Sequence, residues 1–187
     1  MTTAKGKSGG QTHVALLRGI NVGGRNKLPM SALTEVFERA GCEDVRTYIQ
    51  SGNVIFRAPR ELARQIPAVV AEAIRERVGV AVPVVVRSGA QLRSIVAGNP
   101  LADDGDLSKV HVVFLADRPS RRLLASLDPD RSPPDRFVAK GSEVYLECPN
   151  GIARTRLTNA YFDAKLATVS TVRNWNTVTK LLQLARG

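Results

Sequence analysis

The chain has few of the residues that build metal and redox sites. It contains two cysteines, Cys42 and Cys148, and two histidines, His13 and His111, among 187 residues. Two distant cysteines provide neither a disulfide framework nor the ligand spacing of a zinc site. We therefore expect no metal site and no cofactor. Free thiols indicate a reducing compartment and favour a cytoplasmic protein.

Long apolar runs are also missing. None approaches the roughly 18 residues of a membrane-spanning helix. The N-terminus is polar and glycine-rich and lacks the hydrophobic segment of a secretory signal. We expect residues 1–11 to form a flexible tail, and we expect no membrane partner. Apolar residues still make up 43% of the chain, which is enough to form a core.

Acidic residues are nearly absent from both ends of the chain. Residues 1–34 contain five basic side chains and no acidic one, and residues 148–187 contain six basic side chains and one acidic. Each end therefore has a net charge of +5, the whole excess of the chain, because its total is +10. High net charge favours solubility, but its segregation to two segments favours an anionic partner.

The pattern of apolar residues predicts the order β-α-β-β-α-β twice. Strands are expected at 13–18, 45–50, 53–57, 80–87, 110–116, 137–140, 143–148 and 169–173. Helices are expected at 30–40, 61–78 (with Pro67 preceded by a turn or producing a kink), 89–97, after the cap Ser120, at 156–166 and after the cap Asn176.

This order is that of the split β-α-β, or ferredoxin-like, fold. We predict an α+β protein with two tandem ferredoxin-like subdomains (α-β plaits), at 12–88 and 109–187. Residues 89–108 provide a linking helix and loop, and the second subdomain ends in an additional helix. The residues of the two halves show no convincing repeat, so the predicted repetition is one of architecture.

Strand order predicts where the charged loops meet. In a ferredoxin-like sheet the strands lie in the order 4-1-3-2, so the loop after the first strand and the turn between the second and third strands share one end. The loop after the third strand and the end of the fourth strand share the other. If the halves pack with opposite polarity, GINVGGRNK and QSGN from the first half face CPNGIARTR and RNWN from the second. These four segments would then line one cleft.

Five segments carry a family resemblance: LLRGINVGG, NKLPM, TYIQSGNVIF, RLTNAYFDAKL and TVRNWNTVTKL. Together they resemble the bacterial DUF1697 family over roughly residues 13–185. The family pattern has Ser-Lys where this chain has Thr155-Arg156, which keeps a positive charge. The resemblance implies a two-part α+β fold with ferredoxin-like subdomains. It implies no activity, because the family is named for the absence of an assigned one.

The glycine-rich loop after the first strand suits a phosphate or carboxylate, because glycines expose backbone N–H groups next to a helix start. It is neither a P-loop nor a dinucleotide fingerprint. The alternative is a tight connection with incidental charge. Near the C-terminal end of the chain, Arg154 and Arg156 precede a predicted helix, where positive side chains are unfavourable next to the helix dipole. A bound anion would offset this repulsion. The alternative is that both side chains are solvated. Trp175 could stack on a base or pack in the core.

No catalytic residue can be named. Ser51 has no histidine near it in sequence, and His13 and His111 each lie at the start of a strand, which favours structural roles. The acidic cluster at 103–106 lacks the calcium-loop spacing and is expected to be a solvated linker. The candidate ligand-binding residues are Arg18, Asn21, Gly23, Gly24, Arg25, Asn26, Lys27, Gln50, Ser51, Asn53, Arg154, Arg156, Asn159, Arg173, Asn174 and Trp175.

The first functional hypothesis is a binding module for an anionic ligand, a nucleic acid or a nucleotide or phosphate, in a basic cleft between the subdomains. The alternative is a metal-independent enzyme acting on a phosphorylated or carboxylated small molecule. A second alternative is a structural or protein-interaction role, with the Asn and Arg motifs packing the halves together. Whether a reaction is catalysed, and in what oligomeric state, stays open from sequence.

Overall fold

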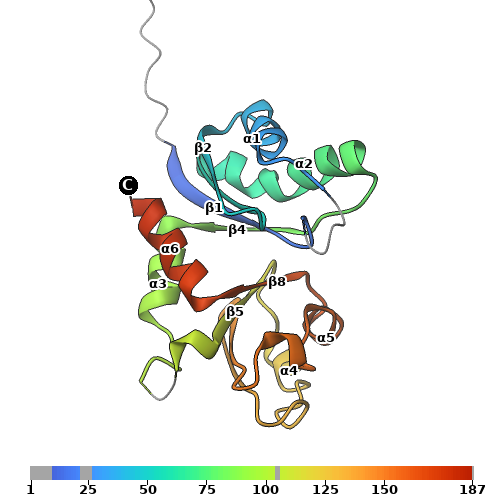
Figure 1. The fold of residues 1–187 in the computed structure, drawn as a ribbon, viewed down its shortest axis with the longest axis vertical. Helices are drawn as coiled ribbons and strands as arrows, with labels where there is room; N and C mark the ends of the chain where they lie inside the picture. The colour runs from blue at the N-terminus through green and yellow to red at the C-terminus, as the bar shows by residue number, and fades with distance from the viewer. Residues whose placement is uncertain (1–9, 22–26, 104–105, 187) are drawn as a thin grey trace, which may run out of the picture.

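Two buried apolar strands form the centres of two separate sheets. They are β1 (Gln11–Leu17) and β5 (Val110–Leu115). The structure is a computed structural model that describes residues 10–21, 27–103 and 106–186. These residues contain two four-stranded antiparallel sheets and six α-helices (Figure 1). Most of the predicted tail and the centre of the glycine-rich loop lie outside them.

In the first half β1 is the second strand from one edge of its sheet, whose order is β2-β3-β1-β4. This is the strand order that the sequence predicted. The helices α1 and α2 cover one face of the sheet, because their apolar residues recur at helical spacing. The elements are β1, α1 (Met30–Arg39), β2 (Glu43–Tyr48), β3 (Asn53–Ala58), α2 (Arg60–Val78), β4 (Val84–Ser88) and α3 (Gly89–Ala97).

The second half repeats the same order. Its sheet has the order β6-β7-β5-β8, and α4 and α5 cover the face away from the first half. The elements are β5, α4 (Arg121–Leu124), β6 (Arg136–Lys140), β7 (Glu143–Glu147), α5 (Asn159–Leu166), β8 (Ser170–Asn174) and α6 (Trp175–Arg186), with short 3₁₀ turns at Leu107–Lys109 and Ile152–Arg154.

Several element ends differ from the prediction for local reasons. β2 ends at Tyr48 because Ile49 and Gly52 have positive φ and form the turn to β3. β4 begins only at Val84, directly after Pro83, a residue with no N–H to donate to a ladder. α2 is continuous through Pro67, so no separate turn precedes it.

Two predicted helix starts were wrong, because the capping residue is another one. α5 begins at Asn159 rather than Arg156, since the Thr158 hydroxyl accepts a hydrogen bond from the Tyr161 N–H. α6 begins at Trp175, and its cap is Asn174, not Asn176: the Asn174 side chain accepts a hydrogen bond from the Thr177 N–H at 2.8 Å.

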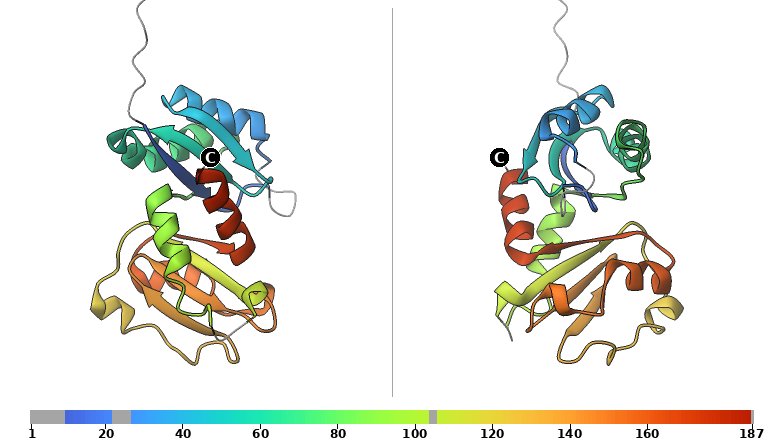
Figure 2. Two further views of the ribbon diagram at one scale, coloured as in Figure 1. Left: turned by 90° about the vertical axis from the view of Figure 1, so that its left-hand side faces the viewer. Right: turned by 45° about the vertical axis from the view of Figure 1, so that its right-hand side comes forward.

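Both faces of the central strands are covered. Ala15 and Leu17 of β1 pack under α1 and α2, whereas Val14 and Leu16 face a core shared by the two sheets. This shared core is closed by α3 and α6, which pack against each other beside the sheets (Figure 2). We call it the joint core. The central strands therefore present no open face for stacking nucleic-acid bases.

The corrected cap gives a test of α6. We expect Asn174→Ala to lower the free energy of unfolding by about 1 kcal/mol, because the first turn of α6 loses a hydrogen-bond acceptor. Asn176→Ala, in the same turn, should change it by less than about 0.5 kcal/mol. Urea denaturation followed by circular dichroism measures both. Equal losses in the two variants would contradict the assignment of the cap.

Candidate functional site

Arg173 joins the two halves by reaching from β8 into the first half. Its guanidinium donates hydrogen bonds to the carbonyl oxygens of Leu17 (2.6 Å), Ser51 and Gly52, and to Oδ1 of Asn53 (2.6 Å). Two further bonds go to its own strand. Burial lowers its pKa to about 10, so it stays charged at pH 7. All three nitrogens thus serve the protein's own acceptors.

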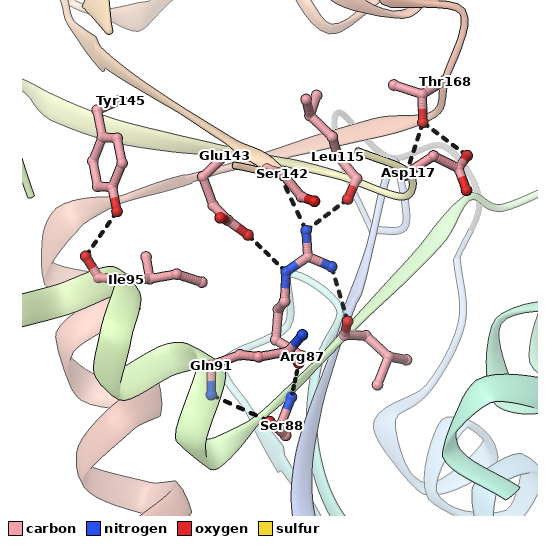
Figure 3. Close-up of polar contacts among 11 residues, drawn as sticks. Arg87, Ser88, Gln91, Ile95, Leu115, Asp117, Ser142, Glu143, Tyr145 and Thr168 are labelled. Carbon is pink, nitrogen blue, oxygen red and sulfur yellow. Dashed lines mark hydrogen bonds and ion pairs between the residues drawn. The ribbon is translucent and has the colours of Figure 1, made fainter. Parts of the chain in front are cut away.

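Arg87 does the same in the opposite direction, from β4 into the second half (Figure 3). It donates to the carbonyl oxygens of Leu115 (2.6 Å) and Ser142 (3.2 Å), and to Oε1 of Glu143 at 2.8 Å. Only 6% of its surface is exposed. This residue was not among the candidates predicted from the sequence.

The two arginines occupy equivalent places in an internal repeat. In the sheet registers Arg87 lies opposite Val14, and Arg173 lies opposite Val112. Each arginine contacts the end of the other half's central strand and the tip of its hairpin. We call this pair the reciprocal arginines. The repeat extends to single residues, in contrast to the expectation from sequence.

The repeat has further members beyond the arginines. His13 pairs with Ser88 at one site and His111 with Asn174 at the other, and Ser88 and Asn174 cap α3 and α6. The other end of each capped helix is also contacted by the opposite half: Arg46 donates to the Leu184 carbonyl and Lys140 to that of Gly98.

Arg18, the first residue after β1, connects its loop to the second half. Its Nη1 donates to Oδ2 of Asp163 on α5 at 2.7 Å and to the Ser170 carbonyl at 2.8 Å. The Ser170 hydroxyl in turn donates to Oδ1 of Asp163 at 2.6 Å and lies 3.1 Å from Oδ1 of Asn159. The Arg18 and Asp163 side chains stay 29% and 23% exposed. The loop after β1 therefore contacts the second half, but at α5 and β8.

The glycine-rich loop is fixed at both ends by Asn21. Its side chain bonds both the N–H and the carbonyl of Leu28, and its own φ is positive. Gly23, Gly24, Arg25 and Asn26 lie outside the described residues. Lys27, at the end of the loop, is exposed, and α1 begins three residues later.

The other candidate residues divide into buried and exposed ones. Asn53 is fully buried and bonds Tyr48 and Ser51, and Trp175 packs in the joint core. Trp175 is thus a core residue. Gln50, Arg154 and Arg156 are exposed. Their side chains have no hydrogen-bond or ion-pair partner within the described part of the chain.

A groove of about 900 Å³ lies on the side of Arg87. It follows the free edge of β4 and is bounded by α2, the first turns of α3 and residues of the second half. The groove could not be predicted from the sequence, because it depends on how the halves pack. Its lining includes Gln11, His13, Arg60, Arg64, Val84, Val86, Ser88, Gln91, Ala116, Asp117 and Glu143.

The histidines and cysteines have shifted pKa values because they are buried. Burial lowers the pKa of His13 and of His111. His13 also stacks on Phe56, with ring centroids 5.5 Å apart. Burial raises the pKa of both thiols, Cys42 and Cys148, to about 11, so they are protonated at pH 7. Within the described ranges no three His, Cys, Asp or Glu residues gather as a metal site would require.

The fold and the arginine contacts define a class of two-sheet α/β proteins whose halves are joined by reciprocal arginines. The model of the family described as "Protein of unknown function (DUF1697)" matches residues 11–145, and the chain belongs to this family. The matched range contains the first sheet and, of the second sheet, β5, β6 and the start of β7. No helix among the described residues is long and apolar enough to cross a membrane.

A solved structure shares this fold. It is titled "The structure of conserved bacterial protein SP0830 from Streptococcus pneumoniae" and superposes with a TM-score of 0.74 at 19% sequence identity. The match covers 95% of this chain and 99% of that one. No curated protein matches the chain.

The contacts of Arg173 predict a large effect of its loss. We expect Arg173→Met to lower the free energy of unfolding by about 3 kcal/mol, because each carbonyl left without a donor costs about 1–3 kcal/mol. Arg122→Met, at an exposed position of α4, is the matched control and should change it by less than about 0.5 kcal/mol. Chemical denaturation decides: a loss below about 1 kcal/mol for Arg173→Met would show that the contacts contribute little.

The buried histidines predict a pH dependence. Their folded pKa lies below the ordinary value of about 6.5, so the unfolded state binds more protons as the pH falls below that value. Stability should be highest above about pH 6.5 and decline towards about pH 5.5. In His13→Gln the decline should be shallower, as measured by urea titrations at several pH values. An unchanged slope would exclude His13 as a contributor.

Proposed function

We propose that the protein binds an anionic ligand, a nucleic acid or a nucleotide or phosphate, at the loop that joins β1 to α1. The observation that carries the proposal is the unusual N-terminus of α1. Pro29 precedes this ten-residue helix, no side chain caps it, and its first turn has no acidic residue. Its first N–H groups thus keep a positive partial charge without a partner side chain.

The other α-helices in the described part of the chain lack this combination. α3, α4, α5 and α6 are capped by the side chains of Ser88, Ser120, Thr158 and Asn174. α2 also follows a proline, but Glu61 lies in its first turn and compensates its dipole. The N-terminus of α1 is therefore the one among them that an external anion would stabilise most.

Basic side chains lie at both ends of this loop and shortly before α5, the helix that Arg18 contacts. Lys27 is exposed just ahead of α1, and Arg18 is partly exposed at the other end of the loop. Arg154 and Arg156 are exposed shortly before α5, the helix that Arg18 contacts through Asp163. Both basic ends of the chain would thus attract an anion: Lys27 and Arg18 from the N-terminal end, and Arg154 and Arg156 from the C-terminal end.

We also infer that both halves are ferredoxin-like plaits. This inference is supported by the order β-α-β-β-α-β in each half, by strand orders with the fourth strand beside the first, and by helices on one face of each sheet. In such a plait the loop after the first strand lies at an end of the sheet.

The second candidate is a structural role for the Asn and Arg motifs. It is favoured by one observation: the donors of Arg173 and the side chain of Asn53 are used in contacts between the halves. The two roles concern different residues and are compatible. The structural role accounts for Asn53, Arg173 and Asn174, and the ligand role concerns Arg18, Lys27, Arg154 and Arg156.

Binding of a labelled single-stranded RNA, followed by fluorescence anisotropy with pyrophosphate as a competitor, tests the proposal. We expect the affinity to fall steeply with salt concentration. Lys27→Ala should lower the affinity about fivefold, because the Lys27 ammonium and the N-terminus of α1 both attract the anion. Lys180→Ala, exposed on α6, is the matched control and should bind like the unsubstituted protein.

Two results would reject the proposal. One is no measurable affinity for RNA or pyrophosphate at low salt. The other is an equal loss in the Lys27 and Lys180 variants, since this would reduce the effect to net charge alone.

A further inference from the structure

The groove beside β4 has a counterpart elsewhere in the molecule, because the halves form a repeat. Leu17 pairs with Val84 in the first sheet, and Leu115 pairs with Ser170 in the second. The next residues also correspond: the N–H of Arg18 donates to Pro83, and that of Ala116 donates to Val169. Val84 therefore corresponds to Ser170, and Ala116 corresponds to Arg18.

The equivalent positions beside β8 and β4 carry different side chains, Arg18 and Ala116. On the β8 side, the guanidinium of Arg18 crosses from the first half to the second and donates to the Ser170 carbonyl and to Asp163. On the β4 side, Ala116 has no side chain that could reach Val84. Both Ala116 and Val84 line the groove. The groove thus lies where the repeat, on its other side, holds the protein's own arginine.

The edge of β4 offers hydrogen-bond acceptors to this groove. The Val86 carbonyl accepts from Arg87, and the corresponding Val172 carbonyl accepts from Arg173, so both point away from the neighbouring strand. In an antiparallel strand every second residue directs its polar groups to the same side. The Val84 carbonyl therefore points outward, as the Ser170 carbonyl does towards Arg18.

Carboxylates at the end of the groove add negative charge. Oδ2 of Asp117 accepts from Thr168, and Oε1 of Glu143 accepts from Arg87 (Figure 3). The second oxygen of each carboxylate has no partner within the ranges that the structure describes. His13 also lines the groove, and burial lowers its pKa, so its ring is neutral at pH 7.

The cations of the groove are paired, with one exception. Arg87 pairs with Glu143, and Arg64 pairs with Glu61 at 3.3 Å. Arg60, in the first turn of α2, has no acidic partner in the part of the chain that the structure describes. A ligand that carries a carboxylate as well as a cation would complement it.

We propose that this groove binds a small guanidino acid, whose guanidinium takes the place that Arg18 takes on the other side of the repeat. The guanidinium donates to the Val84 carbonyl and to Asp117, and the ligand's carboxylate meets Arg60. Planar guanidinium groups present several donors at once and suit a carbonyl and a carboxylate together. This site is separate from the proposed anion site at α1.

Binding of L-arginine to the full chain, measured by isothermal titration calorimetry, tests the proposal. L-Citrulline is the neutral probe of nearly the same shape, and we expect it to bind at least about tenfold more weakly, because it cannot form charge-assisted hydrogen bonds. Asp117→Asn should weaken arginine binding by about tenfold. Asp103→Asn, at an exposed position outside the groove, is the control and should leave binding unchanged.

A second variant fills the groove from within. Ala116 is exposed, so Ala116→Arg is compatible with folding, and its side chain should take the ligand's place and abolish arginine binding. Lys27→Ala, which tests the anion site, should bind arginine normally. Thermal unfolding verifies that each variant is folded.

Three outcomes would overturn the proposal. They are an absence of arginine binding at millimolar concentrations, equal binding of arginine and citrulline, and undiminished arginine binding in both Asp117→Asn and Ala116→Arg.

Discussion

The arrangement of the molecule depends on two arginine side chains that are fixed by backbone carbonyls of the opposite half. A buried guanidinium needs acceptors for all its donors, because an unpaired buried charge is far more costly than an unpaired amide. Arg87 and Arg173 each meet this requirement at the same structural place, the end of the central strand and the hairpin tip across the interface. Such contacts are directional, so they fix the relative orientation of the sheets, whereas the joint core supplies non-directional apolar burial.

The same constraint separates structural residues from residues that remain available to a ligand. A residue whose polar atoms are used inside the protein cannot also bind a ligand without breaking those contacts. Arg173 and Asn53 belong to the first group, and Lys27, Arg154 and Arg156 to the second. Arg18 lies between them, since it is partly exposed and bonded through one nitrogen to Asp163 and Ser170. Dense Asn and Arg motifs in a sequence therefore need not indicate a binding site.

Much of the secondary structure could be predicted from sequence. Apolar periodicity gave the helix ends of α1 and α3 almost to the residue, and glycines marked the ends of α1 and α2. The predicted cap of α6 was wrong. Asn174 and Asn176 have equal propensities to cap a helix, and only the backbone path selects between them. The predicted strand order placed the hairpin turn of the first half near the end of β8, and Arg173 of β8 does contact that turn.

The contacts between the halves could not be predicted, although a signal existed. The repeat is visible in HVALL and HVVFL on the central strands, and in Val-Arg-Ser and Val-Arg-Asn at the starts of α3 and α6. These matches are short, and only the sheet registers show that they are equivalent. The groove could not be predicted for another reason. It lies where Ala116 has only a methyl group and the repeat has Arg18, and a single small residue forms no recognisable sequence pattern.

The joint core has a consequence for how such a chain can change. Val14 and Leu16 on one side and Val112 and Phe114 on the other lie in one apolar cluster, with α3 and α6 around it. Two surfaces that contact each other in this mutual way correspond to the interface of a symmetric homodimer, in which the same patch serves both partners. In a true homodimer every substitution appears twice. Joining the copies in one chain removes that restriction, so that one copy can carry Arg18, which bonds the opposite half, while the other carries Ala116 and leaves a groove.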